Sequence, residues 1–282
     1  MTIGIIGMGY VGTALKEGFK SCHKIETYDL DDSLSSCDSI NTLISKTQII
    51  FLCVPTPMNK NGSCDLSIVE GIIAEIDSCI NNESDKIIII KSTIPPGTTE
   101  KLNNAYHKFN IIFNPEFLTE ANFIEDFKNQ NRIILGGLKT ITTKIKQIYI
   151  EIFPRSEIIE TDSTHAEMVK YFANTFLATK VSFANEMKMI CDKLHIDYNK
   201  VVEYAIYDDR LGDSHWSVPG PDGKLGFGGS CFPKDINALI SVASELGIDS
   251  KLLKSTWETN LKVRPEKDWE ILKGRAIAND KD

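Results

Sequence analysis

The stretch IGIIGMGYVG, residues 3–12, decides the fold. A short apolar run leads into Gly7, Gly9 and Gly12, which have the spacing GxGxxG. Such glycines allow a tight turn, close approach of a pyrophosphate to the backbone, and close packing of a helix whose N-terminus binds the phosphates. The stretch therefore predicts a strand, a dinucleotide-binding loop and a helix. The alternative is a glycine-rich turn in an α/β domain that binds no nucleotide.

Apolar runs like the first one recur through the first half of the chain. Their hydrophobicity is continuous rather than alternating, which is typical of parallel strands buried on both faces. Helical segments lie between them, so residues 1–157 are predicted to form a Rossmann-type, doubly wound α/β domain with a parallel sheet. The predicted strands are residues 3–6, 24–29, 49–54, 86–92, 109–114 and 132–137.

An acidic residue, Asp29, ends the second predicted strand. At this position a carboxylate accepts hydrogen bonds from the ribose hydroxyls of a dinucleotide. Leu30, Asp31 and Asp32 follow it and provide no arginine for a 2′-phosphate. The sequence thus favours NAD over NADP as the cofactor.

The pattern changes after residue 157. Residues 163–194 contain neither Pro nor Gly, which predicts one helix of roughly 30 residues, about 45 Å long. Thr164 and Glu167 have the spacing of a capping box at its start. With shorter helices after it, residues 158–282 are predicted to be an all-helical central domain. An unpaired helix of this length would expose much apolar surface, so we expect a homodimer.

Composition narrows the possible partners and the cellular location. Net charge is −8 over 282 residues, which disfavours general binding to nucleic acid or anionic membranes. The seven cysteines form no CxxC pair, and the chain starts without the features of a signal peptide, so we expect a reduced, cytoplasmic protein. The histidines have no metal-site spacing, and no apolar run reaches the ~18 residues of a membrane span.

A second motif, GFGGSCFPKD at residues 226–235, places a cysteine at a predicted helix start. Pro233 suits the first helical position, and a thiolate at Cys231 is favoured by the helix N-terminus and by Lys234. The alternative is a buried structural cysteine. Combined with NAD, a thiolate can oxidise an aldehyde to an acid: it adds to the aldehyde, the adduct gives up a hydride, and the thioester is hydrolysed.

Seven motifs follow one another along almost the entire chain: GMGYVG (7–12), CVPTP (53–57), KSTIPPGT (91–98), NPEFLTEA (114–121), KYFANTFLATK (170–180), DDRLG (208–212) and GFGGSCFPKD (226–235). Taken together, these motifs resemble the UDP-glucose/GDP-mannose dehydrogenase family. The family normally continues into a second α/β domain, whereas this chain stops soon after TWETNLKV, so it resembles a short form without that nucleotide-binding domain.

The resemblance implies a four-electron oxidation of a nucleotide sugar from C6 alcohol to carboxylate by two NAD, with UDP-glucose as the expected substrate. UDP-N-acetyl-hexosamine and GDP-mannose are the near alternatives. A truncated, non-catalytic module that binds NAD or a sugar nucleotide is another. A third is a two-electron hydroxyacid dehydrogenase, which would not require Cys231. The loop at residues 215–225 is expected to replace some contacts of the missing domain.

The resemblance also implies roles for individual residues. Cys231 is the nucleophile, Lys170 and Asn174 stabilise oxyanions, Asp235 assists water or proton transfer, and Glu116 is the acid/base of thioester hydrolysis. Thr93 positions the reacting hydroxyl or a water. The implied cofactor residues are Gly7, Gly9, Tyr10, Val11, Gly12, Asp29, Val54, Pro55, Thr56, Ser92, Thr93, Glu120, Cys231 and Lys234. The implied substrate residues are Glu116, Phe117, Leu118, Lys170, Asn174, Phe227, Gly228, Gly229 and Arg210, the last reaching a neighbouring subunit's substrate.

Each implied role has a structural alternative. Lys170 could be a solvated lysine on a helix surface. Glu116 and Asp235 could simply cap a turn and a helix.

Overall fold

The structure is a computed structural model that describes residues 1–279, and the chain forms two compact units. Unit 1 contains Met1–Thr56 and Leu66–Lys170, and unit 2 contains Pro57–Asp65 and the chain from Tyr171 onward. A domain boundary between residues 157 and 158 stays a prediction. The two units are described separately below.

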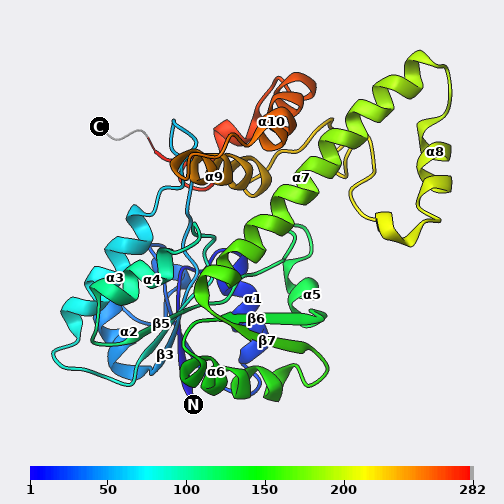
Figure 1. Ribbon diagram of the computed structural model, residues 1–282. Helices are drawn as coiled ribbons and strands as arrows, with labels where there is room; N and C mark the ends of the chain where they lie inside the picture. The colour runs from blue at the N-terminus through cyan, green and yellow to red at the C-terminus, as the bar shows by residue number, and fades with distance from the viewer. Residues whose placement is uncertain (280–282) are drawn as a thin grey trace. The chain divides into compact units, whose positions relative to one another are not determined.

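Unit 1 is built on one seven-stranded sheet with the order β2-β1-β3-β4-β5-β6-β7 (Figure 1). The first five strands in this order are parallel, as the continuous apolar runs predict. The Rossmann-type α/β fold is therefore confirmed. The strands are β1 (Thr2–Ile6), β2 (Lys24–Tyr28), β3 (Ile49–Leu52), β4 (Ile87–Ile90), β5 (Asn110–Phe113), β6 (Arg132–Gly136) and β7 (Glu157–Thr161).

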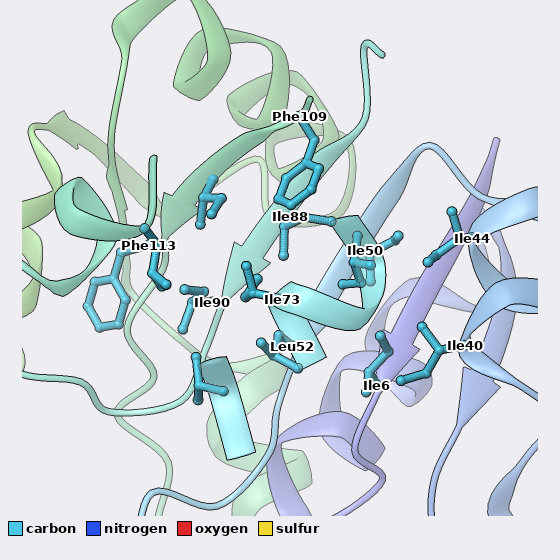
Figure 2. Packing of buried hydrophobic residues seen from close by; sticks show 14 of the residues in the cluster. Ile6, Ile40, Ile44, Ile50, Leu52, Ile73, Ile88, Ile90, Phe109 and Phe113 are labelled. Atoms are coloured by element: carbon cyan, nitrogen blue, oxygen red, sulfur yellow. The ribbon is translucent and has the colours of Figure 1, made fainter. Parts of the chain in front are cut away.

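Each face of the sheet carries its own hydrophobic core. Ile50 and Leu52 belong to a cluster with side chains of α2, α3 and α4, part of which Figure 2 shows. Ile49 and Phe51 belong to a second cluster with side chains of α1, α5 and α6. Because successive side chains of a strand point to opposite faces, this division makes the domain doubly wound. The helices are α1 (Tyr10–Phe19), α2 (Ile40–Lys46), α3 (Ser67–Cys79), α4 (Thr98–Ala105), α5 (Phe123–Lys128) and α6 (Lys139–Ile152).

The far edge of the sheet differs from the sequence prediction. β6 pairs antiparallel with β5, and β7, which was not predicted, pairs parallel with β6. An antiparallel strand starts at the edge where its partner ends, so the segment from Asn114 to Asn131 does not have to cross the sheet. This reversal keeps the NPEF stretch and α5 at the carboxyl ends of the parallel strands.

The long helix α7 (Ser163–Lys193) has 31 residues, which confirms the predicted helix. Its start is not the predicted capping box, because Thr164 already lies inside the helix. Asp162 instead accepts the N–H of His165 at 2.9 Å. The buried Glu167 carboxylate accepts the N–H groups of Gly97 and Thr99 at 2.5 and 2.8 Å. The capping-box prediction was wrong because Glu167 caps the start of α4 instead.

Unit 2 is mainly helical, as predicted. It contains most of α7, then α8 (Tyr198–Ala205), α9 (Phe232–Glu245) and α10 (Lys251–Val263). Ala178, Phe227 and Ile236 form a small core against α10. Short 3₁₀ turns complete the structure: η1 (Asp32–Leu34) in unit 1, and η2 (Asp209–Leu211) and η3 (Asp268–Ile271) in unit 2.

Within residues 1–279, none of the helices combines the length and the apolar character needed to cross a membrane. The same residues contain no group of three or more His, Cys, Asp or Glu side chains that could hold a metal ion. The seven cysteines are free thiols.

Candidate active site

The glycine loop between β1 and α1 has the geometry that the sequence predicts. Gly7 has φ 90°, a left-handed conformation that favours glycine. A methyl group at Gly12 would lie 2.0 Å from the carbonyl oxygen of Gly7, so only glycine lets the helix approach the loop. A methyl group at Gly9 would meet nothing within 4 Å. Gly9 therefore leaves open space at the N-terminus of α1, where a phosphate binds favourably.

Asp29 lies where β2 ends and is bonded to the same loop. Its Oδ2 accepts the N–H of Met8 at 2.6 Å, and its Oδ1 accepts the N–H of Asp31 at 3.0 Å. A carboxylate has about four lone-pair sites, so acceptor capacity remains for ribose hydroxyls. Asp29 thus has a structural role in the loop as well as its predicted cofactor role.

The loops after β3 and β4 are tied together by side-chain hydroxyls. Thr56 Oγ1 donates to the carbonyl of Thr93 at 2.7 Å, and Ser92 Oγ donates to the carbonyl of Val54 at 2.6 Å. These bonds bring the CVPTP and KSTIPPGT motifs side by side at the carboxyl ends of neighbouring strands. Ligands of open α/β sheets bind at that edge.

Tyr10 of the glycine motif contacts another predicted cofactor residue, Glu120. The Tyr10 hydroxyl donates to Glu120 Oε2 at 3.5 Å, and the Tyr10 ring lies 5.3 Å from the ring of Phe123. Val11 is partly buried against the second core cluster. The structure therefore places Tyr10 and Glu120 together, although they are far apart in the sequence.

Glu116 and Lys170 form a buried ion pair in unit 1. Lys170 Nζ donates to the Glu116 carbonyl at 2.6 Å and to Glu116 Oε1 at 3.1 Å, and only 3% of Lys170 is exposed. Oε2 of the carboxylate accepts the N–H of Leu118 at 2.6 Å. The Phe117 ring lies beside both Lys170 and Arg132. Lys170 is thus not a solvated surface lysine.

The environment keeps the Glu116 carboxyl ionised. Burial acts to raise its pKa, but the positive charge of Lys170 and the N–H of Leu118 outweigh burial, with a contribution from Lys91. The net effect is a pKa below the usual value. An ionised, positioned carboxylate can accept a proton from water, which is what a general base does.

A second charged group surrounds Cys231 in unit 2. Cys231 is the residue just before α9, as predicted, whereas Pro233 is the second residue of the helix rather than the first. Lys234 Nζ donates to Asp235 Oδ1 at 2.5 Å, and Asn174 Nδ2 donates to Asp235 Oδ2 at 2.6 Å. Asp235 is 1% exposed. The structure therefore unites Asn174, Lys234 and Asp235 next to the cysteine.

Lys234 remains a cation in this group. Burial acts to lower its pKa, but Asp235, Cys231 and Cys64 outweigh that effect and raise it. The interaction is reciprocal: a fixed ammonium near Cys231 favours the thiolate, as does the N-terminus of α9.

The glycine-rich stretch before Cys231 is held by an asparagine, Asn260, that the sequence did not indicate as a functional residue. Asn260, fully buried on α10, accepts the N–H of Phe227 at 2.7 Å and donates to its carbonyl at 2.9 Å. A methyl group at Gly226 would lie 2.3 Å from Asn260 Oδ1. One at Gly228 would lie 2.5 Å from Arg264 Nη2, while Gly229 faces open space.

Arg264 is the other missed residue, and it holds the loop at residues 215–225. Arg264 is only 1% exposed. Its guanidinium donates to Asp222 at 2.6 Å, to Asp268 at 2.6 and 2.9 Å, and to the Leu225 carbonyl at 3.2 Å. Lys224 also pairs with Asp268 at 3.0 Å. The feature of the sequence that could have indicated Arg264 is a charged side chain directly after the helical stretch TWETNLKV. The role in ligand contacts expected for this loop stays a prediction.

Arg210 has a different setting. It lies on η2, its side chain is 87% exposed, and it pairs with Asp208. A role toward a neighbouring subunit stays a prediction.

Unit 1 thus has a dinucleotide-type glycine loop on a Rossmann-type sheet, and unit 2 has a cysteine at a helix start beside a buried cation. Residues 23–154 match the NAD binding domain of the UDP-glucose/GDP-mannose dehydrogenase family, and residues 164–262 match its central domain. The chain belongs to the UDP-glucose/GDP-mannose dehydrogenase family, and its cofactor is NAD.

Named relatives support this assignment. UDP-glucose 6-dehydrogenase TuaD of Bacillus subtilis is 36% identical over 247 residues, 85% of this chain and 52% of the relative. The structure of a UDP-glucose dehydrogenase from Pyrobaculum islandicum superimposes with a TM-score of 0.85 at 30% identity, covering 93% of this chain and 68% of that one. The structure of a GDP-mannose dehydrogenase from Pseudomonas aeruginosa superimposes with a TM-score of 0.68 at 27% identity, covering 93% of this chain and 69% of that one. The chain spans about half the length of several curated relatives.

Substitutions at two glycines separate cofactor binding from folding. We expect Gly9→Ala to fold normally but to bind NADH more weakly, because its methyl group enters open space where the phosphates bind. Gly12→Ala, whose methyl group meets the Gly7 carbonyl, should lower the melting temperature. Fluorescence titration with NADH and thermal unfolding measure the two effects. Equal NADH affinity in wild type and Gly9→Ala would contradict the assignment of the loop.

Proposed function

We propose that this chain catalyses the NAD-dependent, four-electron oxidation of a nucleotide sugar from C6 alcohol to carboxylate. The observation that carries the proposal is Cys231 at the N-terminus of α9, beside the cation Lys234, in a chain with an NAD binding domain. An alcohol dehydrogenase that stops at the carbonyl needs no thiol. A nucleophilic thiolate allows the second oxidation to pass through a covalent intermediate.

The proposed reaction has three stages. Bound NAD accepts a hydride in each of the two oxidations. In the first, C6 loses a hydride and its hydroxyl loses a proton, which leaves an aldehyde. In the second, the Cys231 thiolate forms a C–S bond to C6, and the resulting oxyanion adduct loses a hydride to become a thioester. Water then adds to the thioester, the C–S bond breaks, and the carboxylate and the thiolate are released.

Each charged group has a role in this sequence that follows from its own surroundings. Lys170 supplies a buried cation for developing negative charge on oxygen, and the Asn174 amide donates a hydrogen bond. Glu116, held ionised, accepts the proton of the attacking water. Lys234 stabilises Cys231 as the attacking and leaving thiolate. Asp235 orients Asn174 and Lys234 through two hydrogen bonds and assists proton transfer, while Thr93 positions the hydroxyl or the water.

UDP-glucose is the proposed substrate, with UDP-glucuronate as the product. Relatives named UDP-glucose 6-dehydrogenase support this choice. GDP-mannose and UDP-N-acetyl-hexosamine remain the near alternatives, since one similar structure is named a GDP-mannose dehydrogenase. Phe117, Leu118, Gly228 and Gly229 are the proposed substrate contacts.

We also propose a homodimer formed through α7. Phe172, Phe176 and Phe183 are 66%, 58% and 52% exposed on this helix, and the first two rings stack at 6.5 Å. Large apolar side chains gathered on one helix are typical of an interface.

The number of NADH formed per sugar tests the proposed reaction. With limiting UDP-glucose, wild type should form two NADH per sugar and release UDP-glucuronate. Cys231→Ala should form no acid, because no thioester can form, whereas Cys22→Ala, which changes an exposed cysteine, should match wild type. One NADH per sugar from wild type, or acid formation by Cys231→Ala, would contradict the mechanism. GDP-mannose and a UDP-N-acetyl-hexosamine are tested in parallel.

The proposed dimer is tested by placing a charge on α7. Phe176→Lys should convert a dimer into a monomer, because burying an unpaired ammonium in an apolar interface is costly. Leu138→Lys is the control, since Leu138 is also a large apolar residue and is 69% exposed, but lies before α6. Sedimentation velocity measures the masses. A monomeric wild type, or a dimeric Phe176→Lys, would refute the interface.

A further inference from the structure

Unit 1 contains a second buried lysine to which neither the motifs nor the proposed mechanism gives a role. Lys91, at the carboxyl end of β4, is 5% exposed. Its Nζ donates to Asn114 Oδ1 at 2.9 Å and to the Pro115 carbonyl at 3.4 Å. These two residues immediately precede Glu116 in the chain. Lys91 therefore holds the turn from which the Glu116 carboxylate projects.

Asn114 is fixed from the other side as well. Its Oδ1 accepts a hydrogen bond from the Tyr149 hydroxyl on α6 at 2.5 Å, and its Nδ2 donates to the Ile134 carbonyl on β6 at 2.7 Å. The ammonium, the phenol and the strand carbonyl thus leave Asn114 little freedom. A buried lysine with these partners is costly to desolvate, so its position calls for an explanation beyond packing.

Lys91 and Glu116 also face the same cavity. This cavity has a volume of about 450 Å³, and its lining includes Lys91, Glu116, Phe117, Asp126 and Arg132. A charge on Lys91 acts on Glu116 through a region of low dielectric rather than through bulk water.

We propose that Lys91 is a positioning residue for Glu116: it fixes the turn at Asn114 and Pro115, and its positive charge keeps the Glu116 carboxylate ionised for thioester hydrolysis. This inference rests on the proposed function for its catalytic part. The electrostatic coupling itself does not depend on which substrate is used.

The charges around Lys91 determine how the coupling depends on pH. Burial lowers the pKa of Lys91 to about 8, while Cys53 and Glu116 act to raise it and Lys170 acts to lower it. Burial raises the pKa of Cys53 to about 12 and that of Tyr149 above its usual value, so both are neutral near pH 8. Asp126 and Arg132 are the other charged groups of the cavity. Below about pH 8, Lys91 is therefore positively charged beside Glu116.

The catalytic part is tested with the pH profile of acid formation. In Lys91→Met, Glu116 loses a neighbouring positive charge, so its pKa rises and the acid limb of kcat shifts to higher pH. The KM for the sugar nucleotide should stay unchanged. Lys91→Arg, which keeps the charge, should restore the wild-type profile, and Tyr149→Phe, which loosens Asn114 but keeps the charge, should not shift it. A Lys91→Met profile that coincides with wild type would overturn the proposal.

The electrostatic part is tested without any substrate. The pKa of folded Glu116 lies below the ordinary glutamate value of 4.5, and Lys91 is one of the groups that lower it. A lowered pKa stabilises the fold above the unfolded value, and this stabilisation is lost as pH falls through the folded pKa. Without the charge of Lys91 the pKa of folded Glu116 rises, so Lys91→Met should lose less stability than wild type as the solution is acidified from about pH 6. Parallel stabilities of the two proteins over this acidification would overturn the proposal.

A direct titration covers the case in which Lys91→Met does not fold. In wild type labelled with ¹³C at the glutamate carboxyls, the Glu116 resonance should titrate below the usual glutamate range, and titration at or above that range would overturn the proposal. These substrate-free results separate the two inferences. If wild type oxidises none of the tested sugar nucleotides, the proposed function fails, while stability and titration still decide the coupling of Lys91 to its surroundings.

Discussion

A lysine ammonium buried in a protein must be given partners, and this requirement shapes the functional groups of both units. Lys170 is bound by the carboxylate and the carbonyl of Glu116, and Lys234 is bound by Asp235. Desolvating each cation costs several kcal/mol unless its hydrogen bonds are satisfied. Each lysine therefore fixes the position of one carboxylate. A positioned carboxylate and a positioned cation are what acid–base and thiolate chemistry require.

The backbone delivers these groups to fixed positions by simple means. In unit 1, the antiparallel reversal at β6 keeps the segment after β5 at the carboxyl ends of the parallel strands, where the glycine loop and Asp29 also lie. In unit 2, α9 begins directly after Cys231, so helix geometry sets the distance from the thiol to Lys234 and Asp235. The bond from Asn174 then fixes Asp235 against α7. Local structure thus positions each group, and buried hydrogen bonds set its charge.

Much of the fold was predictable because it follows from local patterns. Runs such as IIII in β4 are apolar at every position, which is typical of a strand covered on both faces. β7 was missed because its sequence, EIIET, mixes charged and apolar residues, as an edge strand can. The capping-box prediction was wrong because Glu167 accepts hydrogen bonds from backbone N–H groups at the start of α4, which is distant in sequence. Asn260 was missed for the same reason, because its partners are backbone atoms of Phe227. Arg264 has one partner nearby in the sequence, Asp268, but its bonds to Asp222 and to the Leu225 carbonyl are equally distant.

The central claim is that Cys231 carries the sugar as a thioester, and trapping that intermediate tests it most directly. Glu116→Gln removes the base that activates water while it leaves the thiol, so the acyl group should accumulate. After incubation of this variant with NAD and UDP-glucose, intact-mass and peptide mass spectrometry should find one nucleotide-sugar acyl group on Cys231. An unmodified Cys231 in a variant that still releases UDP-glucuronate would contradict the account.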